Sequence, residues 1–123
     1  MTTHWMVPVA LLLNLLILVP LCTALLNRSP GMDQSFGPET DARLILTSVY
    51  MAIAVVSAAL LVALWTGAGW VLPAALALFA VQIVYKVTTA ALLGIASPVV
   101  MTNLFVVAVQ LATFAAVAAS WRA

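Results

Sequence analysis

Four long runs of apolar residues divide the chain, and polar residues gather between them. The runs cover residues 5–26, 41–64, 71–95 and 98–120. A membrane-spanning helix needs about 20 consecutive apolar residues, so each run is long enough to cross a bilayer as a helix. The pattern therefore predicts an all-α protein, an integral membrane antiparallel four-helix bundle that forms a single domain over residues 1–123.

The connections between the runs differ in length and chemistry. Residues 27–40 contain two prolines, two glycines and two of the three acidic groups, which predicts an extramembrane loop. Residues 65–70 form a short uncharged turn. Ser97 and Pro98 supply an N-cap and a first-turn proline for the last run.

The second run begins with residues that are typical of a helix start. Pro38 suits the first helical turn, and Glu39 and Asp41 would lie near the positive end of the helix dipole. Further along, polar or small residues recur at three- and four-residue steps on one helix face, namely Arg43, Thr47, Tyr50, Ala54 and Ser57. We expect this face, and Asn14 in the first run, to point into the bundle.

Composition agrees with a membrane protein and excludes several functions. Hydrophobic residues make up 67% of the chain, charged residues only 6%, and the mean hydropathy is +1.27. Four Lys and Arg residues give no basic patch for nucleic acid. The single histidine, His4, and the single cysteine, Cys22, supply no haem ligand pair, metal cluster or disulfide, so we expect no cofactor and no metal.

The four tryptophans support the count of four spans. Trp5, Trp65, Trp70 and Trp121 fall at the run ends that four spans place at one membrane interface, where tryptophan is enriched. The loop at 27–40 then lies at the opposite interface. The Lys and Arg count does not fix the orientation, and we expect both termini to be cytoplasmic.

Lys86 is the main candidate for function, because it lies inside an apolar run. A charged side chain at membrane depth costs several kcal/mol and usually faces protein or water. The polar pocket predicted around it consists of Lys86, Gln82, Tyr85, Thr89, Asn103, Gln110, Arg43 and Tyr50. The predicted ion-pair partners of Lys86 are Asp41 and Glu39 at the start of the second run, and Asp33 in the loop.

Two interpretations of Lys86 follow from this pattern. In the first, the polar residues form a pocket for an anion, a quinone carbonyl or a lipid head group. In the second, Lys86 reaches toward the interface and pairs with a loop carboxylate, while the other polar side chains make ordinary interhelical hydrogen bonds. The sequence leaves both open.

Small residues at four-residue spacing suggest close helix contacts. Ala108, Ala112 and Ala116 form such a series in the last run, and Ala54 with Ala58 and Ala59 with Ala63 form two pairs in the second. We expect these contacts within the bundle, with a homo-oligomer or other membrane-protein subunits as the alternative. Membrane lipid is the other expected partner.

The hydropathy pattern, with a second span entered through FGPETDAR, resembles small bacterial DoxX-like membrane proteins. The resemblance implies a compact bundle in the bacterial inner membrane, sometimes associated with redox or respiratory partners. We expect a non-enzymatic accessory subunit of a larger membrane complex. The alternative is a lipid- or quinone-binding protein, or a small transporter, that uses the pocket around Lys86.

The four-span topology predicts that the C-terminus and the loop lie on opposite sides of the membrane. Reporter fusions after Ala123 and within residues 31–37 should therefore report opposite compartments. Activity of both reporters in the same compartment would require an even number of crossings between them, which would contradict the four-span topology.

Overall fold

The chain folds into helices throughout the part that the structure describes. The computed structural model describes residues 5–122, with the side chains of 121 and 122 left out. In chain order the helices are α1 (Met6–Leu26), α2 (Met32–Phe36), α3 (Asp41–Trp65), α4 (Val71–Leu93) and α5 (Pro98–Arg122), and these residues form no strand. Within this part, four helices are long and apolar enough to cross a membrane, which confirms the predicted helical class.

The helix ends follow local chemistry and differ slightly from the predicted ones. Pro38 and Glu39 precede α3 instead of starting it, because Thr40 is the N-cap and its hydroxyl accepts a bond from the Arg43 N–H at 3.4 Å. Asp41 is thus the acidic residue of the first turn. The chain leaves the helical conformation at Gly94, with φ 82° and ψ 176°, so α4 ends two residues earlier than predicted.

The predicted loop at 27–40 contains a short helix, α2, that the sequence analysis missed. Glycines with positive φ flank it, Gly31 at 90° and Gly37 at 79°. The buried Arg43 guanidinium holds this segment against α3, since its Nη1 donates to the Asp33 carboxylate and, at 2.8 Å, to the Gly37 carbonyl oxygen. The Asp33 carboxylate and the Gly37 carbonyl oxygen thus hold α2 against the start of α3.

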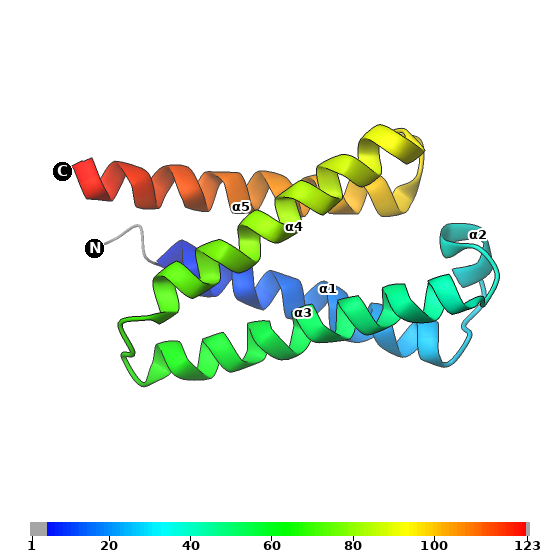
Figure 1. The fold of residues 1–123 in the computed structure, drawn as a ribbon, viewed down its shortest axis with the longest axis horizontal. Helices are drawn as coiled ribbons and strands as arrows, with labels where there is room; N and C mark the ends of the chain where they lie inside the picture. The colour runs from blue at the N-terminus through cyan, green and yellow to red at the C-terminus, as the bar shows by residue number, and fades with distance from the viewer. Residues whose placement is uncertain (1–4, 123) are drawn as a thin grey trace.

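The four long helices contact one another around a shared interior. α1 lies beside α3 and α5, and α4 also contacts both of these helices. The start of α1, the turn between α3 and α4 and the end of α5 lie at one end of the molecule (Figure 1). α2 and the turn between α4 and α5 lie at the other end. Trp5, Trp65 and Trp70 are exposed at the first end, as the tryptophan pattern predicts.

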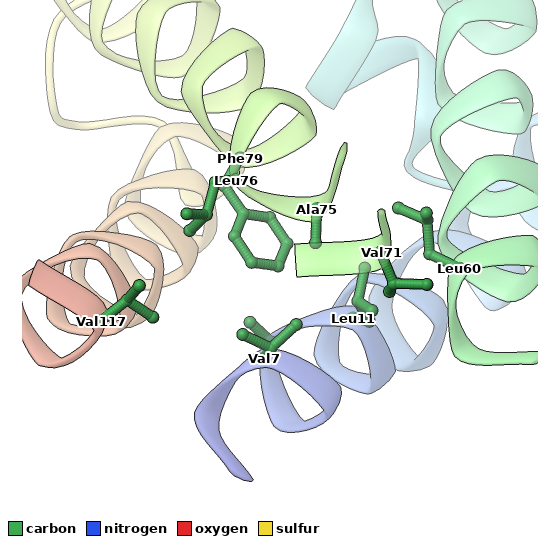
Figure 2. Packing of buried hydrophobic residues seen from close by; sticks show 9 residues of the cluster. Val7, Leu11, Leu60, Val71, Ala75, Leu76, Phe79 and Val117 are labelled. Atoms are coloured by element: carbon green, nitrogen blue, oxygen red, sulfur yellow. The ribbon is translucent and has the colours of Figure 1, made fainter. Parts of the chain in front are cut away.

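Apolar side chains fill the interior near the turn between α3 and α4. Val7 and Leu11 of α1, Leu60 of α3 and Val117 of α5 surround the start of α4, where Phe79 is fully buried (Figure 2). Side chains from all four long helices therefore meet in one cluster. Van der Waals contacts within this cluster contribute the non-directional part of the helix packing.

The distribution of polarity is the reverse of that in a water-soluble protein. Large apolar side chains such as Leu16, Val55 and Val84 point outward, each 66% exposed, while Gln82 and Gln110 are fully buried. Soluble proteins rarely expose so continuous an apolar surface. The exterior is therefore matched to an apolar surrounding, and buried polar side chains such as Asn14 and Gln82 bond to one another inside.

The alanine series lies partly on this exterior. Ala108 and Ala112 of α5 are exposed and Ala116 is half-buried. On α3, Ala58 and Ala59 are exposed as well. The expectation of contacts within the bundle is therefore wrong for the exposed alanines Ala58, Ala59, Ala108 and Ala112. Larger side chains on the other faces of α3 and α5 make the interior contacts.

Candidate functional site

A network of side-chain amides joins all four long helices in the interior. Asn14 of α1 and Gln82 of α4 bond reciprocally: Asn14 Nδ2 donates to Gln82 Oε1 at 2.8 Å, and Gln82 Nε2 donates to Asn14 Oδ1 at 3.2 Å. Gln110 of α5 also donates to Gln82 Oε1, at 2.8 Å. Asn14 further donates to the Ser57 hydroxyl of α3, at 3.2 Å. The expected inward orientation of Asn14 is confirmed, and the role of this network is to hold the helices together.

The inward face predicted for α3 is also present. Arg43, Thr47, Tyr50 and Ser57 are all buried, and Ala54 is half-buried. The Thr47 hydroxyl donates to the Arg43 carbonyl oxygen at 2.9 Å, one turn earlier in the same helix. These residues carry polar groups from the α2 end to the centre of the molecule.

Lys86 lies closer to α2 than the amide network does, one turn beyond Gln82 on α4. It is only 4% exposed, and its Nζ donates to Asn103 Oδ1 of α5 at 2.9 Å. The same nitrogen lies 5.0 Å from the centroid of the Tyr85 ring, within the range of a cation–π contact. The predicted interior position of Lys86 and its proximity to Asn103 are thus observed.

The predicted ion pair between Lys86 and a carboxylate is not observed in the described residues. Asp33 pairs with Arg43, and Glu39 pairs with Arg28 at 2.8 Å. The hydrogen bond with Glu39 raises the pKa of the Arg28 guanidinium. Both arginines lie in the loop or beside it, close to the carboxylates that they pair with. Lys86 is farther away, because it lies seven residues, or about 10 Å, before the end of α4.

A cavity of about 270 Å³ opens beside Lys86. Its walls come from all five helices, α4 contributing Lys86, and most of the lining residues are apolar. The lining residues are Ile17, Leu18, Leu21, Met32, Ser35, Phe36, Tyr50, Lys86, Pro98, Val99, Thr102 and Asn103. Lys86 and Asn103 form a polar end within an otherwise largely apolar space.

The structure separates the predicted pocket residues into several groups. Lys86, Asn103 and Tyr50 line the cavity. Gln82 and Gln110 belong to the amide network, and Arg43 holds α2. The remaining two form a local pair on α4, where the Thr89 hydroxyl donates to the Tyr85 carbonyl oxygen at 2.7 Å. Within the described residues the buried Tyr85 hydroxyl has no hydrogen-bond partner.

Three cavity residues, Met32, Ser35 and Phe36, come from α2 and were absent from the prediction. Met32 and Phe36 are four residues apart, so one turn of helix brings both to the same face. The Phe36 ring packs edge-on against the Tyr50 ring, with centroids 6.3 Å apart. Two large apolar residues four positions apart in an otherwise polar loop are the sequence signal that could have predicted α2 and its contact with the bundle.

Comparison of the chain with family models, with curated proteins and with solved structures gives no match. Its function is therefore inferred from the contacts and the cavity themselves. The space bounded by Lys86, Asn103 and α2 is the candidate site, because it combines a buried cation with room for a molecule.

The amide network predicts a large cost for removing Gln82. The substitution Gln82→Leu would leave Asn14 and Gln110 buried without three of their hydrogen bonds. We expect a loss of about 1–3 kcal/mol in unfolding free energy, measured by denaturant titration in detergent. The control Val81→Leu, on the exposed side of α4, should change stability by less than about 0.5 kcal/mol. Equal stability of the two variants would contradict a stabilising role for the network.

Proposed function

We propose that this protein is an antiparallel four-helix bundle of the bacterial inner membrane that binds one amphiphile of the lipid or quinone class, without catalysing a reaction. The observation that carries the proposal is the cavity with Lys86 and Asn103 at its polar end and apolar walls elsewhere. Such an arrangement matches a molecule with a polar head and an apolar tail. Mostly apolar concave sites with a few convergent polar groups are the usual form of small-molecule sites.

Membrane placement is supported by the chemistry of the exterior. Four helices have the length and hydropathy required for crossing, and their outward faces carry Leu, Val, Ile and Met. Exposed tryptophans at one end match the preference of this residue for the head-group region. With this placement, α2 covers the cavity near the opposite interface, and both chain termini lie on one side.

The position of the cavity also suits an amphiphile. Its lining residues come from the second half of α1 and the first turns of α5, at the end of the molecule that carries α2. A head group at Lys86 would therefore lie close to one interface. The apolar tail would lie along Ile17 and Leu18.

Filling the cavity should remove the bound amphiphile. We expect Val99→Trp to lower the amount of lipid or quinone that co-purifies in mild detergent by about tenfold, since the new side chain occupies the space beside Asn103. Met101→Trp is the matched control, because Met101 lies two residues later on α5 and is 62% exposed. Extraction followed by mass spectrometry measures the retained molecule per protein.

The comparison of these two variants separates specific from general lipid binding. Retention that falls equally in both would indicate lipid around the outer surface, and the proposed site would be rejected. Unchanged retention in Val99→Trp with normal folding would reject it as well.

A second proposal, an accessory subunit of a larger, respiratory or redox complex, is supported by the exposed Ala108 and Ala112 on α5. Outward small residues four apart let another helix approach closely. We expect Ala112→Leu to reduce recovery of a companion subunit by about tenfold in native purification, while Leu111→Ala, at an exposed neighbouring position, should not. Recovery of the protein alone from mild detergent would argue against this assignment.

A further inference from the structure

We infer that the head group bound beside Lys86 is anionic, a phosphate or carboxylate attached to an apolar tail, and that the lysine is its counter-charge. This inference rests on the proposed amphiphile site and specifies the chemical class of its ligand. It is carried by the charge pairing of the described residues, the donors at the cavity and the size of the space.

Among residues 5–122, charge pairing leaves Lys86 as a buried cation without an anionic partner. The chain has three acidic residues, and the structure describes all of them. Asp33 and Glu39 each pair with an arginine, and Asp41 is exposed at the start of α3. None of the three forms an ion pair with Lys86 in the described part of the chain. The one hydrogen bond from Nζ goes to the neutral amide of Asn103.

A buried charge without a counter-charge is costly, and this cost falls when an anion binds. An ammonium group has three N–H donors, and only one of these is used by Asn103 Oδ1. Removing an unpaired ion from water costs several kcal/mol, whereas an anion in contact recovers much of that energy. A ligand with a negative head group therefore stabilises this arrangement more than a neutral one does.

The polar end of the cavity offers donors to such a head group. Lys86 contributes an ammonium, and the Asn103 side chain carries an NH₂ group in addition to the oxygen that binds Nζ. No carboxylate is among the lining residues. Phosphate and carboxylate oxygens are strong acceptors that match this set, while a quinone carbonyl would use only part of it.

The volume of the cavity limits how much of the ligand it encloses. At about 270 Å³ it lies just below the roughly 300–1,000 Å³ of sites that enclose a whole drug-sized ligand. It therefore holds the head group and the first part of a tail. The rest of the tail continues along the apolar exterior, which selects an amphiphile over a free anion.

The test compares probes that differ in the head group. The full-length protein in detergent is incubated with phosphatidylglycerol, with diacylglycerol of the same acyl chains, with oleate, with ubiquinone or with inorganic phosphate, and the retained probe is measured by native mass spectrometry. We expect phosphatidylglycerol or oleate to be retained about tenfold more than diacylglycerol and ubiquinone. Phosphatidylglycerol and oleate distinguish a phosphate source from a carboxylate source.

Variants of α4 assign this preference to the lysine. Lys86→Met should bring the ratio of phosphatidylglycerol to diacylglycerol retention to about one, while Val84→Met, which adds the same residue at a 66% exposed position, should keep it. If Lys86→Met does not fold, the head-group preference of the unmodified protein still decides the question. Inorganic phosphate should not displace the bound lipid, and displacement would overturn the assignment to an amphiphile.

The outcomes separate this inference from the proposed function. Equal retention of anionic and neutral probes, lost from both in Val99→Trp, would overturn the anionic head group and leave the amphiphile site in place. An anionic preference that persists in Lys86→Met would also overturn the role of the lysine. Retention of no probe would reject the proposed function and this inference together.

Discussion

The structure depends on the need of buried polar groups for partners inside an apolar protein. Most outward side chains are hydrophobic, so a polar side chain gains little by facing outward and is satisfied within. The reciprocal Asn14–Gln82 pair meets this need for two helices, and Ser57 and Gln110 extend it to the other two. These bonds are directional, unlike the apolar contacts around Phe79. They therefore fix the rotation of each helix about its axis, and with it the residues that face the cavity.

The same constraint explains why the amide network and the cavity have different roles. In the network, amides supply both donors and acceptors, and the groups largely satisfy one another. At Lys86 the described residues supply one neutral acceptor to a group with three donors and a positive charge. In the first arrangement, Gln110 Oε1 is the buried amide oxygen that has no partner among the described residues. In the second arrangement, two N–H donors and the positive charge of Lys86 have no hydrogen-bonding or anionic partner among the described residues, although the two arrangements lie only one helical turn apart on α4.

The sequence predicted the features that depend on local spacing. Helix limits, the inward face of α3 and the shared face of Gln82 and Lys86 follow from helical periodicity and from capping residues. The partner of Lys86 could not be predicted from the sequence, because the pairing of charges depends on how the loop at 27–40 folds. Arg43 takes Asp33 only because α2 folds back across the start of α3. Hydropathy also could not tell which face of the alanine series would point outward.

The amide network divides the chain into two pairs of helices. The bond from Asn14 to Ser57 lies within the α1–α3 pair, and the bond from Gln110 to Gln82 lies within the α4–α5 pair. Only the reciprocal Asn14–Gln82 bonds cross between the pairs. Each hairpin can thus satisfy part of its own polar groups before the two hairpins meet. The last amides find their partners when the hairpins dock, which makes docking the step that commits the chain to its final fold.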